Sequence, residues 1–273
     1  MVRALRFCVQ PGYSHAFVTA VTRLRRSAGS AAPSSGVLVD HALGSRLVMV
    51  LGGLGVHPAD RLSGAGRRVL AYSAVKGPRV NRILMSMRLW PNLDEGHARA
   101  NLRRALWQIP PGWVTAQDAD VVLEAEVDLR EAYHVASRAL SGEPLDADQV
   151  ELLNRDLLPG WYDDWVVSEQ DQYHLRRIQA LEEACRTAAR SHHFSLATTA
   201  GLAAVCAEPL RESAVTVLVE AHVLEGNRVE AARRYQAYRD RLQREIGVEP
   251  GRALYDLVTN GVAHGPRGTA DRR

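Results

Sequence analysis

Residues 94–109 combine a row of apolar side chains with guanidinium groups at a spacing that suits contact with nucleic acid. At 100° per residue on a helix, Leu102 lies within about 60° of four other apolar residues: Ala98, Ala105, Leu106 and Ile109. The opposite arc carries Gly96, His97, Ala100, Arg103, Arg104 and Trp107. Small residues allow close approach of the helix backbone, and guanidinium forks donate to guanine edges and phosphates. The pattern predicts a helix that enters a DNA major groove; a solvated charged face is the alternative.

The distribution of charge along the chain favours the DNA interpretation. The net charge is only +3. Residues 61–108, however, hold ten Lys/Arg against Asp94 and Glu95, a net +8, whereas residues 109–131 carry a net −5. A basic block beside acidic sequence is typical of a surface that contacts nucleic acid.

The elements that must position this helix are short and well punctuated. A strand is expected at 47–51, ended by Gly52-Gly53, with a hairpin partner at 55–57. Helices are expected at 66–76, 81–90 and 94–109, and a hairpin at 113–124 around 116–119. Asn81 is the expected N-cap of the second helix, whose inward residues we expect to be Ile83, Leu84, Met87, Leu89 and Trp90. Strand, three helices and hairpin predict a winged helix-turn-helix, with the third helix for recognition and the hairpin as the wing.

The sequence offers little for catalysis or for binding cofactors or metals. It contains no GxGxxG, no GxxxxGK[S/T], no GxSxG, no HExxH and no Cys/His set at zinc spacing. His192 and His193 are adjacent and diverge on a helix. Asp163 and Asp164 look like an N-cap and a first-turn acid of the helix that follows them, so we expect neither catalysis nor a cofactor.

Composition places the chain among helical proteins of a reducing compartment. At 273 residues with 46% hydrophobic and 6% aromatic content, two domains are expected. The three cysteines, Cys8, Cys185 and Cys206, form no CxxC pair and are expected to be small buried apolar groups and not ligands. Neither a membrane span nor a secretion signal is expected. Residues 1–46 have a linker-like composition and are predicted to be disordered, with the basic cluster at 23–26 either adding non-specific DNA affinity or only solubilising.

From about residue 131 the pattern becomes all helical and shows a repeat of 34 residues. When Pro209 is aligned with the closing proline of a tetratricopeptide unit, the small and apolar positions fall on Leu181, Ala184, Ala197, Gly201 and Ala204. The next unit has Val215, Leu218, Ala231, Tyr235 and Tyr238 at those positions. It has Gln243 instead of the proline, and a generic helical bundle is the alternative. Stacks of such helix pairs present grooves to proteins or peptides.

Taken together, several segments resemble the Streptomyces antibiotic regulatory protein (SARP) type of transcriptional activator over roughly 47–262. The matching segments are Leu51-Gly52-Gly53, Leu89-Trp90-Pro91, residues 98–107, Val127-Asp128, residues 157–165, residues 208–213, Glu225-Gly226-Asn227-Arg228 and Gly247-Val248-Glu249-Pro250. Residues 1–46 match nothing in the family.

The resemblance implies an OmpR-type winged-helix domain followed by a bacterial transcriptional activation domain of tetratricopeptide-like helices. The fold class expected is therefore mainly α with a small β component. The expected segments are a disordered extension at 1–46, the winged-helix domain at 47–130, the activation domain at 131–262 and a flexible tail at 263–273. The resemblance also implies the small form of the family, without a phosphoacceptor receiver domain.

The function expected is sequence-specific DNA binding in the cytoplasm, associated with the nucleoid. The resemblance implies binding to promoter direct repeats, recruitment of RNA polymerase holoenzyme, and activation of a secondary-metabolite (antibiotic) gene cluster. A homodimer on DNA is one arrangement that the sequence leaves open. The candidate contacts to bases or phosphates are Arg99, Asn101, Arg103 and Arg104 in the recognition helix, Arg79, Asn81 and Arg82 at the start of the second helix, and Thr115 and Gln117 in the wing. The alternative is a repeat-type adaptor that binds proteins and whose basic face is incidental.

Overall fold

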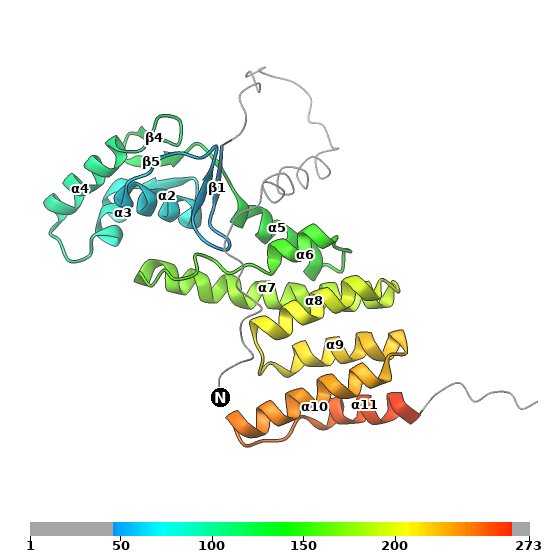
Figure 1. The fold of residues 1–273 in the computed structure, drawn as a ribbon. Coiled ribbons are helices and arrows are strands. Elements are labelled where there is room, and N and C mark those ends of the chain that lie inside the picture. The colour runs from blue at the N-terminus through cyan, green and yellow to red at the C-terminus, as the bar shows by residue number, and fades with distance from the viewer. Residues whose placement is uncertain (1–45, 264–273) are drawn as a thin grey trace, which may run out of the picture. The chain divides into compact units, whose positions relative to one another are not determined.

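The computed structural model describes residues 46–263 (Figure 1). These residues form two compact units, one of residues 46–133 with 155–173, and one of residues 134–154 with 174–263. The predicted extension at 1–46 and tail at 263–273 lie outside the described residues, except for their terminal residues Arg46 and Ala263. The fold is mainly helical with few strands, as predicted.

The first unit contains two small sheets. In one, β1 (Leu47–Met49) pairs antiparallel with β2 (Gly55–His57) and parallel with β6 (Glu126–Val127). In the other, β5 (Asp120–Leu123) lies between β3 (Arg79–Asn81) and β4 (Val114–Gln117), antiparallel to both. The β1–β2 pair and the β4–β5 hairpin were predicted. The short β3 and β6 were not, because two or three residues are too few to show an alternating pattern.

Three helices of the first unit follow the predicted order, and each is capped by a side chain. They are α2 (Gly64–Lys76), α3 (Arg82–Leu89) and α4 (Glu95–Trp107). Ser63, Asn81 and Asp94 accept backbone N–H groups from the first turns of α2, α3 and α4, which satisfies donors that a helix leaves unpaired. Their shared core includes Leu70, Met85, Leu89 and Leu102, all at most 3% exposed.

The prediction for the inward face of α3 was largely wrong. Ile83, Leu84 and Met87 are 42%, 50% and 52% exposed, whereas Met85 and Ser86 are buried with Leu89. On a helical wheel Met85 and Ser86 lie within about 60° of Leu89, but the three exposed residues lie about 120° or more away. The Ser86 hydroxyl is accommodated because it donates to the carbonyl of Ile83 at 2.8 Å.

The end of β1 is held by two distant parts of the chain. Asp128, the first residue of α5 (Asp128–Leu140), accepts the N–H groups of Val50 and Leu51 at 2.9 and 3.1 Å. The N–H of Leu158 donates to the Val50 carbonyl at 2.8 Å. Both the chain that leaves the first unit and the chain that returns to it are therefore anchored at the end of β1.

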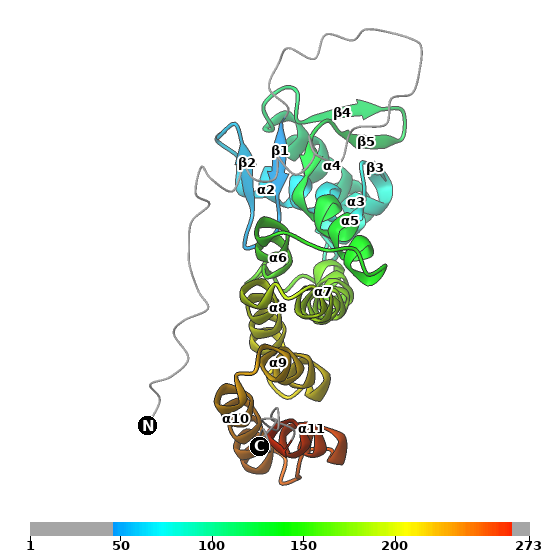
Figure 2. The same ribbon diagram turned by 90° about the vertical axis from the view of Figure 1, so that its right-hand side faces the viewer.

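The second unit is built of helices only, as far as residues 134–154 and 174–263 are described (Figure 2). The helices after α5 are α6 (Ala147–Leu153), α7 (Asp164–Arg190), α8 (Phe194–Ala207), α9 (Glu212–Glu225), α10 (Arg228–Glu245) and α11 (Arg252–Ala263). From α8 to α11, each helix packs against the next along the chain. Both α5 and α7 cross a boundary between the units.

The small residues picked out by the 34-residue alignment are buried where these helices meet. Ala197, Ala204 and Ala231 are at most 1% exposed. A Cβ placed on Gly201 would lie 3.1 Å from both the Cys185 Sγ and a methyl of Leu218, so α8 approaches α7 and α9 too closely for a larger residue without displacement. Helices α9, α10 and α11 share a core that includes Val219 and Leu254.

Candidate nucleic-acid interface

The faces of α4 are divided as the sequence predicted. Ala98, Leu102 and Ala105 are 0%, 3% and 1% exposed and pack inward. Arg103 and Arg104 are exposed on the other side, and Ala100 is half-buried. In Figure 1 α4 lies beside α3, against which it packs. The structure therefore leaves the arc that carries the arginines open to solvent.

The arginines of α4 differ in how much of their hydrogen-bonding capacity is used within the chain. The Arg99 guanidinium pairs with Glu95 at 3.2 Å, one turn back along the helix. Arg104 has only a long contact, 3.5 Å from Nη1 to the Asn101 side-chain oxygen. The Arg103 side chain makes no hydrogen bond or ion pair with any residue in the described range. Because a guanidinium has five N–H donors, most of the donors on this face have no acceptor in the described chain.

Asp94 provides negative charge at the start of α4. Its side chain accepts the N–H of His97 at 3.1 Å, and this backbone hydrogen bond is the largest cause that lowers the pKa of the Asp94 carboxyl. A carboxylate at this end also complements the helix dipole. The positive side chains of α4 therefore lie beyond the first turn, with the acids before them.

The start of α3 and the tip of the wing form a second cluster. The backbone N–H of Arg82 donates to the carbonyl of Ala119 at 2.8 Å, which ties the β4–β5 turn to α3. Arg79 donates to the Gln117 side chain at 2.8 Å and pairs with Asp120 at 3.5 Å. The structure thus brings together three of the predicted contact residues, although Arg79 is already partly neutralised.

Two other predicted contact residues are used within the fold. The Asn81 side-chain oxygen accepts the N–H groups of Ile83 and Leu84 at 3.0 and 3.3 Å, so its acceptor serves as the helix cap. The Thr115 hydroxyl donates to Glu124 across the hairpin at 2.8 Å. The wing turn itself contains Asp118 with a φ of +49°, a conformation that Asp tolerates better than most residues. The sequence did not single out Asp118.

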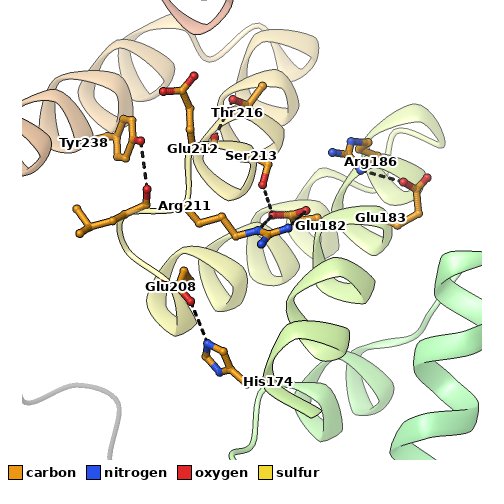
Figure 3. Close-up of polar contacts among 11 residues, drawn as sticks. His174, Glu182, Glu183, Arg186, Glu208, Arg211, Glu212, Ser213, Thr216 and Tyr238 are labelled. Atoms are coloured by element: carbon orange, nitrogen blue, oxygen red, sulfur yellow. Dashed lines mark hydrogen bonds and ion pairs between the residues drawn. The ribbon is translucent and has the colours of Figure 1, made fainter. Parts of the chain in front are cut away.

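The helical unit contains a polar cluster that sequence reasoning missed, in the loop between α8 and α9 (Figure 3). The buried Glu182 of α7 accepts Arg211 Nε at 2.6 Å and the Ser213 hydroxyl at 2.7 Å. Tyr238 of α10 donates to the Leu210 carbonyl of the same loop at 3.3 Å. These contacts are satisfied inside the unit, so they fix the loop between neighbouring helices and do not form a ligand site. The only sequence signal was the stretch 208–213 among the matching segments.

Comparisons with known proteins agree with this architecture. Residues 156–260 match the family model of the bacterial transcriptional activator domain. Among solved structures, the chain is similar to Mycobacterium tuberculosis EmbR in complex with a low-affinity phosphopeptide, with a TM-score of 0.56 and 18% sequence identity. The similarity covers 81% of this chain and 66% of that chain, so this chain spans slightly less than two thirds of the solved protein. No curated protein matches.

The chain therefore combines a winged helix-turn-helix with a segment that matches the bacterial transcriptional activator domain. The family match over residues 156–260 and the fold shared with the solved structure both agree with the resemblance seen in the sequence motifs. In the described residues, 46–263, no helix is long and apolar enough to cross a membrane.

Proposed function

We propose that the protein activates transcription by binding specific DNA sequences through α4, the start of α3 and the β4–β5 wing. The observation that carries this proposal is the exposed arc of α4, where Arg103 and Arg104 lie opposite a buried apolar stripe. A recognition helix of this kind enters the major groove with its first half foremost. Gly96 and Ala100 on the same arc allow the backbone to approach the base edges.

The contacts proposed on DNA divide into two groups. In α4, Arg103 and Arg104 are placed to read guanine edges or bind phosphates, with Arg99 and Asn101 beside them. At the start of α3 and in the wing, the proposed backbone contacts are Arg79, Asn81, Arg82, Thr115 and Gln117. We expect Arg103 to contribute most within the first group, because its donors have no acceptor in the described chain.

The finer role proposed rests on the resemblance to SARP-type activators. The protein is proposed to bind direct repeats in promoters as a homodimer on DNA, to recruit RNA polymerase holoenzyme, and to activate a secondary-metabolite (antibiotic) gene cluster from the cytoplasm, at the nucleoid. In this proposal residues 47–130 read DNA and residues 131–262 contact proteins through tetratricopeptide-like helices. It involves no catalytic step and no cofactor.

A gel-shift experiment against promoters next to the protein's own gene tests the proposal. A surface that neutralises about 6–10 phosphates should lose about 10³–10⁵ in affinity between 50 and 200 mM salt. A specific footprint with this salt dependence supports a DNA-binding activator. Binding that is absent, or unaffected by salt, would favour an adaptor that acts only through protein contacts.

A further inference from the structure

Trp107 is the residue of the recognition helix that the proposed contacts leave without a role. Its side chain is 86% exposed, although tryptophan is usually well buried on average. Of the five tryptophans in the sequence, the others are buried or half-buried. Within residues 46–263, the Trp107 ring stacks on no other aromatic ring and its indole N–H donates to no acceptor. The fold therefore does not need this side chain in its observed position.

The position of Trp107 on α4 points to a ligand on the arginine side. Residues 96, 100, 103 and 107 follow one another at intervals of three or four and share one line along the helix. The line extends about 16 Å at 1.5 Å per residue. Along it the side chains grow from glycine through alanine and arginine to tryptophan, and Trp107 occupies the last turn of α4.

A helix whose side chains grow in this way contacts different parts of a DNA duplex with its two ends. Its narrow first half fits the floor of the major groove, where base edges are read. Its last turn then lies at the groove edge, where the sugar-phosphate backbone passes. An indole suits that place because it combines an apolar ring, which packs on deoxyribose, with an N–H that donates to a phosphate oxygen.

We propose that Trp107 is a DNA-backbone contact, packing on a deoxyribose and donating its indole N–H to a phosphate at the edge of the groove that α4 enters. The inference rests on the proposed DNA-binding function and adds a contact to it. Trp107 carries no charge, so it neutralises no phosphate. Its loss should weaken binding to every sequence alike and leave the salt dependence of affinity unchanged.

The test compares Trp107→Ala and Trp107→Phe with wild type on two duplexes, the promoter fragment and a duplex of arbitrary sequence. We expect Trp107→Ala to bind both about tenfold more weakly, because a hydrogen bond to a charged group and the ring contact are lost. Trp107→Phe keeps a ring but no donor and should lie between the two. Tyr162→Ala is the matched control, since Tyr162 is an 85% exposed aromatic outside the proposed interface.

Fluorescence quenching by acrylamide gives a second measurement. In the free protein Trp107 should dominate the quencher-accessible emission, and DNA should protect it; in Trp107→Phe this protected fraction should be missing. If Trp107→Ala binds both duplexes like wild type while Arg103→Ala weakens binding, the Trp107 contact is refuted and DNA binding stands. A loss confined to the promoter fragment would instead make Trp107 a base reader, and failure of wild type to bind either duplex would refute the proposed function itself.

Discussion

Two arginine-rich helices of this protein use the same side chain in different ways. In α10, Arg233 and Arg234 both pair with Glu230, at 3.2 and 2.6 Å, and Arg241 pairs with Glu245 at 3.0 Å. Arg239 pairs with Glu249 in the loop beyond the helix at 2.7 Å. In α4, Arg99 pairs with Glu95 at 3.2 Å. The helix with more arginines, α10, is therefore the one in which most arginines are paired with a glutamate.

The comparison shows that the number of arginines on a helix does not indicate DNA binding. Glutamates spaced three or four residues from arginines in α10 form local pairs that stabilise an exposed helix modestly. In α4 the acids are confined to residues 94 and 95, before the arc that carries Arg103 and Arg104. Guanidinium donors without acceptors within the chain are those available to phosphates and bases.

The largest expected effect separates the two faces of α4. Leu102→Ala removes a side chain that is 3% exposed and leaves a cavity, so it should lower the free energy of unfolding by about 2–5 kcal/mol. Arg103→Ala, on the exposed face, should change it by no more than about 0.5 kcal/mol. Thermal or urea unfolding of the two variants measures the difference. Equal destabilisation would show that the arginine face is part of the fold.

Asp128 supports a prediction about pH because its side chain is fully buried. Its carboxyl accepts backbone N–H groups, whereas the carboxylate of the buried Glu182 accepts an arginine. Burial raises the pKa of Asp128 to about 7, although the N–H groups of Val50, Leu51 and Leu129 act to lower it. Between about pH 4 and pH 7 the folded state therefore holds a proton that the unfolded state releases. The stability linked to that proton is fully present below this range and is lost as the pH rises through it.

The loss should reach about 4 kcal/mol, at about 1.4 kcal/mol for each unit of pKa difference. Asp128→Asn has no charge to bury, so the decrease in unfolding free energy from about pH 4.5 to about pH 8 should be smaller in the variant than in wild type. Urea titrations across this range measure the slope. Parallel curves for Asp128→Asn and wild type would contradict the prediction.

Much of the winged helix could be predicted because its signals are local. Asn81 and Asp94 stand where helix N-caps should be, and Gly77-Pro78 follows the last turn of α2. The faces of α4 followed from helical periodicity alone. The same periodicity, applied strictly, would have placed Ile83, Leu84 and Met87 outward on α3. That error came from treating every apolar residue of a short helix as inward.

The parts that could not be predicted depend on residues far apart in the sequence. Nothing near Asp128 indicates that its carboxylate accepts N–H groups from Val50 and Leu51, 78 and 77 residues away. Nor does the sequence show that Arg211 reaches Glu182. By its number of arginines, α10 would be chosen before α4 as a DNA-binding helix. The ion pairs in the structure are what favour α4 instead. The contact residues proposed on DNA stay a prediction.

A third prediction compares neighbouring acids of α7 that differ in burial. Glu182 is 6% exposed at its side chain and accepts both Arg211 and Ser213, so Glu182→Ala leaves two donors without their acceptor. We expect a loss of about 1.5–3 kcal/mol in unfolding free energy, the range for hydrogen bonds to charged groups. Glu183 pairs with Arg186 one turn away, and Glu183→Ala should cost only about 0.2–0.5 kcal/mol. Similar losses for both variants in chemical unfolding would show that the α8–α9 loop does not depend on the Glu182 contacts.

The last prediction tests the comparison between α4 and α10 directly. Arg103→Ala should weaken promoter binding by about 1–3 kcal/mol if the guanidinium contacts a guanine, with relaxed preference at that base. If it contacts a phosphate, it should weaken all sequences alike and lower the salt slope by about one. Arg234→Ala removes the same group from α10, where it is already paired with Glu230, and should leave DNA affinity and its salt slope unchanged. Its cost to stability should be small, about 0.2–0.5 kcal/mol, since only one helical ion pair is lost. A loss of affinity in Arg234→Ala equal to that in Arg103→Ala would mean that pairing within the chain does not remove an arginine from the DNA-binding surface.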